Sequence, residues 1–234
     1  MTFCTDIRIQ LLLKLDPEYM IGLCADTIRD DGLHKALYHF FGERTTFVKA
    51  SLNKPLKIYC IKTEFKAVME RKRDGKVDFN KVIDSLSYNS ERNKLIADIA
   101  EIFYYHRTLI LCKRVKQAEE INELLCEKGL QSALYCGTHK NISNFQILCS
   151  TIQKVERGFD LANAMGDSYD GMPITMVIYA SSLTKPQQSV GRAFRSNNPS
   201  AIYLLDDNSI LKSHWIKCEK YFKKGNTEIH YDFI

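Results

Sequence analysis

Two arginines and a glycine in the segment TKPQQSVGRAFR, 184–195, have the residue types and spacing of an anion-binding site. In a helix, Gln188, Gly191, Arg192 and Arg195 lie at i, i+3, i+4 and i+7 and therefore share one face. The glycine leaves room for a bulky anion, and two fixed guanidiniums suit a phosphate better than lysines do. A solvated basic face on an amphipathic helix explains this segment equally well, so the rest of the chain must decide.

A second set of candidates follows the apolar run FQILC, 145–149, which we expect to be a strand. In parallel sheets, ligands bind beyond the carboxyl ends of the strands, and this run leads to Thr151 and then to ERGFD, 156–160. Gly158 permits a turn or a close backbone approach, and Asp160 can accept a hydrogen bond from a ligand hydroxyl. A helix cap followed by an aspartate turn is the alternative interpretation of ERGFD.

The elements expected to position these residues alternate between strands and helices. Apolar residues recurring every three or four positions predict helices over residues 90–105, 115–128 and 211–222. Short apolar runs predict strands at 108–112, 132–136, 145–149, 176–180 and 201–206. Such alternation implies an α/β fold with a parallel sheet. Before it, residues 57–65 are strand-like, and residues 66–88 form a basic connector in which Asp74 and Gly75 indicate a hairpin or a short helix.

Composition limits the classes of protein to consider. The formal net charge of +5 allows nucleic acid as a partner without requiring it. The eight cysteines include no C-x-x-C pair, and neither they nor the six histidines have metal-ligand spacing, so no metal site is expected. No apolar run approaches the roughly 18 residues of a membrane helix, and Asp6 and Arg8 argue against a signal peptide. We therefore expect a soluble intracellular protein of the cytoplasm or nucleus.

The C-terminal part resembles the second motor lobe of a superfamily-two helicase. The segment QSVGRAFR, 188–195, matches motif VI of that superfamily, Q-x-x-G-R-x-x-R. Thr151, Gly158 and Asp160 match the T-x6-G-x-D pattern of motif V, and TLILCKR, 108–114, looks like motif IV. The order and separation of the motifs agree with the superfamily. The resemblance implies a RecA-like, P-loop-type lobe over residues 89–234.

The N-terminal part is similar to the region around motif III in helicases of the XPB type and their relatives in large DNA viruses, which suggests a viral protein. The similarity lies in YMIGLCADTIRDDGL, 19–33, where Cys24 to Thr27 depart from the usual [ST]-A-T-P. The chain contains neither a G-x-x-x-x-G-K-[ST] motif nor a D-E-x-[DH] box. We therefore interpret residues 1–65 as the remnant of a first lobe and residues 66–88 as its connector to the second.

The resemblance also implies roles for individual residues. Arg192 and Arg195 would act as arginine fingers on the γ-phosphate of ATP, and Gln188 would orient it. The other expected contacts are with nucleotide for Gly158, Asp160 and Gly191, and with DNA or RNA for Thr151, Lys113 and Arg114. A solvated strand end is an equal alternative for Lys113 and Arg114.

Bound ATP and Mg²⁺ would need a separate chain that supplies the Walker A and D-E-x-[DH] motifs. The chain alone is then expected to hydrolyse ATP poorly or not at all. The competing hypothesis is an inactive orphan lobe that serves as a nucleic-acid or protein binding module.

Overall fold

The computed structural model describes residues 54–139, 142–156, 159–193 and 195–231, together with residues 9–11, 13–15, 17–21, 32 and 35–42. For residues 37, 187, 188 and 193 the description covers the backbone alone. The chain divides into two compact units, Met1–Ser51 and Leu52–Ile234. In the first unit, helix α2 (Ala36–Phe41) ends at Gly42, whose φ of 83° terminates the helix. The motif III residues 24–27 lie outside the described residues.

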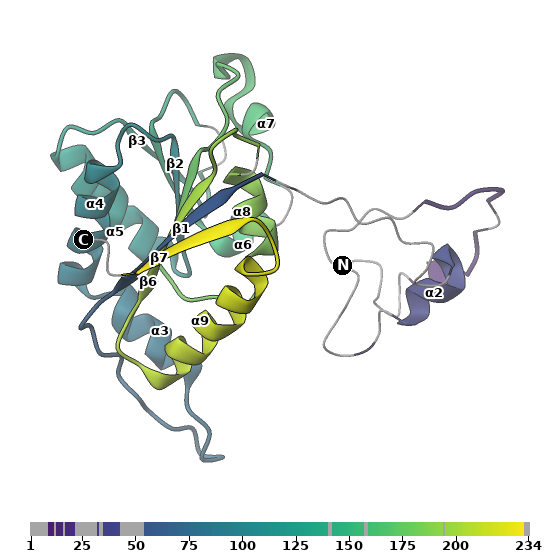
Figure 1. Cartoon of the computed structure of the whole chain (residues 1–234), viewed down its shortest axis with the longest axis horizontal. Helices are drawn as coiled ribbons and strands as arrows, with labels where there is room; N and C mark the ends of the chain where they lie inside the picture. The colour runs from purple at the N-terminus through teal and green to yellow at the C-terminus, as the bar shows by residue number, and fades with distance from the viewer. Residues whose placement is uncertain are drawn as a thin grey trace. The chain divides into compact units, whose positions relative to one another are not determined.

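The second unit is built on a seven-stranded, entirely parallel sheet with the order β3-β4-β2-β5-β6-β1-β7 (Figure 1). This confirms the predicted α/β, RecA-like fold class. The strands are β1 (Leu56–Lys62), β2 (Thr108–Cys112), β3 (Ser132–Tyr135), β4 (Ile147–Thr151), β5 (Met176–Tyr179), β6 (Ser200–Leu205) and β7 (Thr227–Tyr231).

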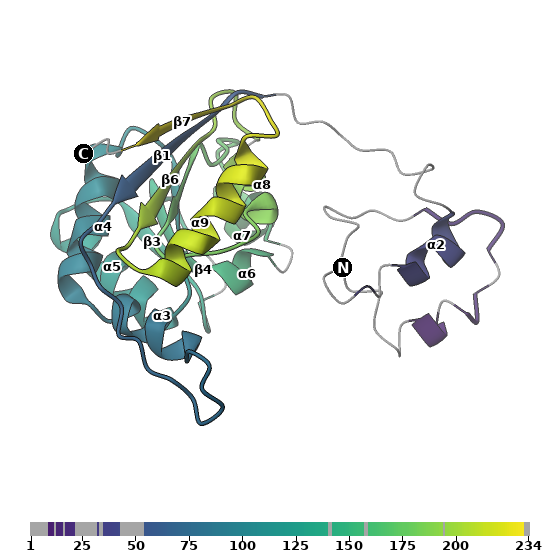
Figure 2. The same ribbon diagram turned by 60° about the horizontal axis from the view of Figure 1, so that its bottom comes forward.

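Helices cover both faces of this sheet, which is why the inner strands β2, β4, β5 and β6 are buried at almost every position. In β2, Leu109 and Leu111 pack into one core cluster, whereas Ile110 and Cys112 pack into the other. The helices are α3 (Phe79–Ser87), α4 (Ser90–Ile102), α5 (Val115–Glu127), α6 (Ile152–Glu156), α7 (Leu161–Met165), α8 (Gln187–Ala193) and α9 (Ser209–Phe222), with the 3₁₀ turn η3 at Gly166–Ser168. Helices α4 and α5 cover one face, and α6 to α9 cover the other (Figure 2).

The boundaries of the second unit differ from the predicted divisions after residues 65 and 88. Strand β1 lies inside the sheet, hydrogen-bonded to β6 on one side and β7 on the other. Its side chains Leu56, Ile58, Cys60 and Ile61 are buried, which requires neighbours on both faces. Residues 56–88 therefore belong to the same compact unit as the predicted lobe. The evolutionary interpretation of residues 1–65 as a first-lobe remnant stays a prediction.

Two elements of the second unit depart from the sequence-based expectations in detail. The connector contains both a hairpin and a helix, α3, whose Val82 and Leu86 pack with Leu211 of α9. Strand β7 was not predicted, because its five residues TEIHY alternate only weakly between buried and exposed positions at the sheet edge. Among the residues that the structure describes, no helix has the length and hydropathy needed to cross a membrane.

Candidate functional site

Helix α8 carries the predicted arginine face. It begins after the carboxyl end of β5, and its buried Val190 anchors it on the sheet. Ser189 also holds it, because its hydroxyl lies 3.0 Å from the Tyr179 hydroxyl and donates to the Pro186 carbonyl at 3.0 Å. The far end of α8 therefore brings Arg192 and the following Arg195 beside the segment that precedes β5.

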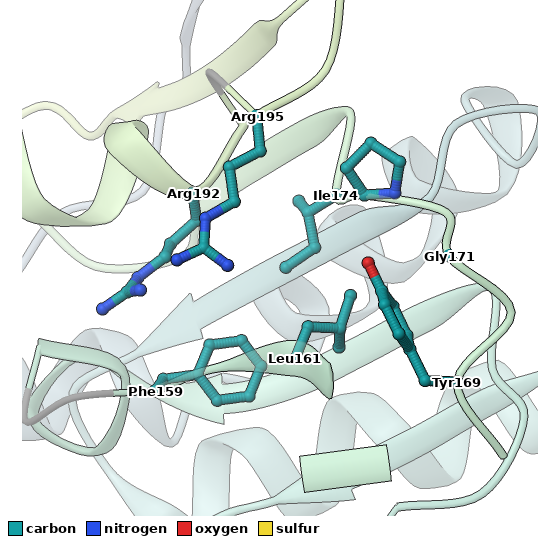
Figure 3. Close-up of a pocket in the computed structure, with 8 residues that line it drawn as sticks. Phe159, Leu161, Tyr169, Gly171, Ile174, Arg192 and Arg195 are labelled. Atoms are coloured by element: carbon teal, nitrogen blue, oxygen red, sulfur yellow. The ribbon is translucent and has the colours of Figure 1, made fainter. Parts of the chain in front are cut away.

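Arg192 and Arg195 line one side of a cavity of about 230 Å³ (Figure 3). Figure 3 shows the two guanidiniums side by side, with Tyr169 across the cavity. The remaining wall is mostly apolar and comes from the segment that leads into α7, from α7 itself and from the loop before β5: Phe159, Leu161, Gly171, Pro173 and Ile174. A cavity with two cations and little other polarity is suited to an anion that carries an organic group.

The Arg192 guanidinium has unused hydrogen-bonding capacity. Its Nη2 donates to the Val155 carbonyl at 3.2 Å, whereas its buried Nε has no hydrogen-bond partner among the described residues. The guanidinium carbon lies 5.9 Å from the centre of the Phe159 ring. Burial, and then the neighbouring Arg195, lower the pKa of Arg192 from its usual value, yet an arginine stays charged at neutral pH. A buried donor without a partner is costly, and an anion would satisfy it.

Asp160 lies beside Arg195. It both caps a helix and contacts a residue of the predicted site, so it fits each of the two interpretations given for ERGFD. Its carboxylate caps α7 by accepting from the Asn163 amide at 3.1 Å. The same carboxylate forms an ion pair with Arg195, with 3.2 Å between Oδ2 and Nη1. The Asn163 amide and then Arg195 hold the pKa of Asp160 below its usual value. Asp160 is therefore an anion at neutral pH that holds Arg195 in place.

The predicted nucleic-acid residues lie elsewhere, at the carboxyl edge of the sheet. Thr151 ends β4 opposite Cys112 of β2, and Lys113 and Arg114 follow directly. The Lys113 ammonium lies 4.7 Å from the centre of the Phe79 ring. Burial, and then the nearby Arg114, lower the pKa of Lys113. Thr151, Lys113 and Arg114 do not line the arginine cavity. Helix α6, which begins directly after Thr151, connects the two places, because its Val155 carbonyl accepts from Arg192.

Arg114 is already engaged by α3. Its Nε donates to Asp84 at 2.6 Å, and its Nη2 donates to the Asn80 side-chain oxygen at 3.3 Å. A solvated strand end, the alternative in the sequence, does not describe Arg114, which fixes α3 to the edge. Of the remaining predicted residues, Gly191 lies in α8 with open space around the position of a Cβ atom. Gln188 is in the same helix, and Gly158 lies outside the described residues. The roles of all nine residues stay predictions.

A buried polar network supports the carboxyl edge from beneath. Arg92, which is 1% exposed, donates to both carboxylate oxygens of Asp206 at 2.8 and 2.9 Å and to the Ala180 carbonyl at 2.8 Å. Sequence reasoning missed this pair, although Arg92 falls on the buried side of its helix, four residues before Ile96. Thr63 also donates to Asp206, at 2.8 Å. The network ties α4 to the carboxyl ends of β5, β6 and β1.

A second buried arginine, Arg107, supports the wall of the arginine cavity and was also missed. Its Nη1 donates to Asp170 at 2.5 Å and to the Met172 carbonyl at 3.0 Å. Its guanidinium carbon lies 4.5 Å from the centre of the Phe145 ring. These contacts fix the loop that contributes Tyr169 and Ile174 to the cavity.

In the described part of the chain, no group of three or more His, Cys, Asp or Glu side chains could hold a metal ion.

Comparisons with known proteins agree with this arrangement. No family model matches the chain. It is 29% identical over 91% of its length to helicase 161L, so named, of Invertebrate iridescent virus 6, and 27% identical over 89% to the protein named as helicase 055L of Frog virus 3. A protein of Acanthamoeba polyphaga mimivirus named as an ATP-dependent RNA helicase is 24% identical over 94% of the chain. The chain covers 51%, 47% and 45% of these proteins, about half of their length.

Solved structures show the same fold. The crystal structure of T4 UvsW matches 85% of this chain and 45% of its own, with a TM-score of 0.54 and 17% identity. The C-terminal domain of the DEAD-box protein Dbp5 matches 77% of this chain and 92% of its own, with a TM-score of 0.51 and 12% identity. The predicted similarity to helicases of large DNA viruses is therefore confirmed, and the solved structures confirm a RecA-like fold like that of the C-terminal domain of Dbp5.

Proposed function

We propose that this chain supplies the second RecA-like lobe of an ATP-dependent helicase and that Arg192 and Arg195 act on the γ-phosphate of ATP. The observation that carries the proposal is the arginine cavity, which is lined by two adjacent guanidiniums and in which the buried Nε of Arg192 lacks a partner among the described residues. Guanidiniums placed in this way stabilise the negative charge that develops during phosphoryl transfer. The similarity to viral helicases over about half their length supports the same assignment.

The residues near the cavity fit part of the nucleotide and not all of it. The orphaned donor of Arg192 and the exposed Arg195 can bind terminal phosphate oxygens. No carboxylate cluster for Mg²⁺ occurs among the described residues, so a partner lobe with Walker A and D-E-x-[DH] motifs would hold the metal and the triphosphate. Bound ATP supplies the phosphoryl group that water attacks. Arg192 and Arg195 of this chain would neutralise the negative charge on that group.

Asp160 has a defined part in this proposal. Without nucleotide, it neutralises Arg195 and fixes its position at 3.2 Å. A phosphate that approached Arg195 would compete with this carboxylate for the guanidinium. Because the side chains of Arg195 and Asp160 are 54% and 37% exposed, the exchange requires little desolvation. The ion pair therefore holds the Arg195 guanidinium in a defined position, where it can exchange the Asp160 carboxylate for a phosphate.

Thr151 and Lys113 are the strongest candidates for the nucleic-acid track. They lie at adjacent strand ends, and the amide of Lys113 is fixed by donating to the Ser181 hydroxyl at 3.2 Å. Arg114 contributes mainly through its bonds to α3. Contacts of this kind fix the position of a phosphate backbone and do not read its sequence. Both DNA and RNA remain compatible with them.

A second candidate function, an inactive lobe that only binds nucleic acid or protein, is favoured by one observation. At the motif III position, Cys24 and Asp26 replace the hydroxyls of [ST]-A-T. A carboxylate there would repel a nearby phosphate. The aligned Arg192 and Arg195 favour the enzymatic proposal instead, because a binding module has little need for two fixed guanidiniums.

A reconstituted ATPase assay tests the proposal. The tagged chain is purified mildly from its native source, its partner is identified by mass spectrometry, and turnover is measured with and without single-stranded nucleic acid. We expect a partner with a Walker A lysine, no turnover by the chain alone, and a loss on the order of 10³-fold in the complex for Arg195→Ala. The control Lys224→Ala, at an exposed position just after α9, should leave turnover unchanged. Turnover by the chain alone, or an unaffected Arg195→Ala complex, would refute the proposal.

A further inference from the structure

We infer that the basic hairpin formed by residues 70–78 is an additional nucleic-acid-binding arm that contacts the phosphate backbone beside Lys113. The inference rests on the proposed function, which places nucleic acid at the carboxyl edge of the sheet. The hairpin follows β1 and precedes α3, and neither candidate set from the sequence includes it. In Figures 1 and 2 it projects away from the sheet beyond α3.

The hairpin is an ordered element held by its own backbone. The Asp78 amide donates to the Glu70 carbonyl, and the Lys72 amide donates to the Lys76 carbonyl, both at 2.8 Å. Gly75 closes the turn with a φ of 79°, a conformation that favours glycine. The Arg71 guanidinium donates to the Gly75 carbonyl at 2.8 Å, which braces the tip. The side chains at the tip are therefore presented on a defined backbone.

The base of the hairpin is rooted in a small hydrophobic cluster. Four partly buried side chains from the segment before the hairpin, its second arm and the start of α3 pack on Val82, Leu86 and Leu211: Phe65, Ala67, Val77 and Phe79. The Val68 amide also donates to the Ser85 hydroxyl of α3 at 3.0 Å. This packing fixes the direction in which the arm leaves the lobe.

The arm leaves the lobe at the predicted nucleic-acid edge. Asp78 caps α3 by accepting from the Asn80 amide at 3.1 Å, and the next residue, Phe79, lies under the Lys113 ammonium at 4.7 Å. One turn further along α3, Asp84 binds Arg114 at 2.6 Å. Both cations of the edge are therefore in contact with the helix that carries the arm. A backbone bound at Lys113 would pass the root of the hairpin.

The tip has the charge that a phosphate backbone requires. The sequence RKRDGK, 71–76, contains four cations and one acid, and all six residues are exposed. The acid, Asp74, lies 3.9 Å from Lys76, a distance typical of a weak surface pair. Among the described residues, no acidic side chain lies within ion-pair distance of Lys72 or Arg73. Both are therefore available to release counterions from a nucleic acid.

A charge-neutralisation experiment tests the arm. The full chain carrying K72Q, R73Q and K76Q is compared with a control carrying K57Q, K220Q and K224Q. The control loses the same charge from exposed positions near the amino edge of the sheet. Arg71 is left intact because it braces the turn. The dissociation constant for a labelled single-stranded oligonucleotide of about 20 nucleotides is measured at several salt concentrations.

The hairpin variant should bind at least about tenfold more weakly at low salt and lower the salt slope by about two, because each lost phosphate contact on a single strand is worth about 0.7. The control should stay within about threefold of the unmodified chain. Equal weakening in both variants, or unchanged binding in the hairpin variant, would overturn the inference and point to bulk charge or to a protein partner of the arm.

Two other variants distinguish a failure of the hairpin inference from a failure of the proposed function. Lys113→Ala reports on the predicted edge, and the ATPase assay with Arg195→Ala reports on the arginine cavity. If Lys113→Ala weakens binding and the hairpin variant does not, the arm alone is rejected. If the hairpin variant weakens binding while Arg195→Ala leaves turnover intact, the arm stands and the arginine mechanism falls. No binding by the unmodified chain rejects the arm together with the predicted edge.

Discussion

Arg107 should be a principal support of the arginine cavity, and its replacement by methionine tests this directly. The side chain of Arg107 is 3% exposed and holds the loop before β5 through Asp170 and the Met172 carbonyl. Methionine keeps apolar contact with Phe145 while it removes the charge and the donors. The loop should then lose its fixed position, and the cavity wall formed by Tyr169 should loosen with it.

The loss of unfolding free energy in Arg107→Met follows from how exposed Arg107 and Asp170 are. Breaking a fully buried ion pair costs about 3–5 kcal/mol, but Asp170 is 33% exposed and can be rehydrated, so we expect about 1–2 kcal/mol from this pair. The lost hydrogen bond from a charged donor to the Met172 carbonyl adds about 1 kcal/mol. The total of about 2–3 kcal/mol corresponds to a Tm lower by about 5–10 °C for a domain of this size.

The dependence on pH gives a second readout for Arg107→Met. The hydrogen bond from Arg107 holds the pKa of Asp170 below its usual value. The resulting stabilisation is present above the unfolded-state pKa of about 3.9 and is lost as pH falls through the lower folded-state pKa. In the variant, this pKa returns towards its usual value. The difference in unfolding free energy between the two proteins should therefore shrink between about pH 5 and pH 3.

Urea unfolding at several pH values, with a matched control, measures these effects. Lys212→Met removes an equally short pair, 2.6 Å from Asp207, whose side chains are both about half exposed. This variant should have almost the same unfolding free energy as the unmodified chain, because exposed pairs contribute little. A change below about 0.5 kcal/mol for Arg107→Met at pH 7, or one that does not shrink in acid, would refute our reasoning.

Three further variants test other parts of the structure. Asp206→Ala leaves the buried Arg92 without its carboxylate and should cost about 3–5 kcal/mol; pairing it with Arg92→Met should recover part of this loss in urea unfolding, and a fully additive double variant would contradict the pairing. Asn208→Ala removes the cap that accepts from the Ile210 and Leu211 amides and should lower the stability by about 1 kcal/mol, whereas an unchanged midpoint would mean that the cap is dispensable. Gly75→Ala strains a residue with a φ of 79° and should destabilise the hairpin by about 1 kcal/mol, which hydrogen exchange of the Lys72 amide would detect as faster exchange or, if we are wrong, as no change.

The fold was predictable where a local pattern was sufficient. Runs such as TLILC contain four consecutive apolar residues after the threonine, a pattern typical of a strand with both faces covered, and the helices between such runs supply that cover. The spacing of Gly191, Arg192 and Arg195 likewise placed them on one side of a helix before any tertiary contact was known. These features depend on residues within a few positions of one another.

Other features were decided by tertiary structure, because they join residues that no local pattern relates. Strand β1 is recruited between β6 and β7, more than 130 residues later in the chain, by the need to bury both of its faces. Arg92 meets Asp206 across 114 residues, and Arg195 meets Asp160 across 35. The amino-acid sequence by itself determined which side chains could bind a phosphate. Only the tertiary structure decided which of these side chains share a cavity, because the register of the strands and the paths of the loops set the distances between them.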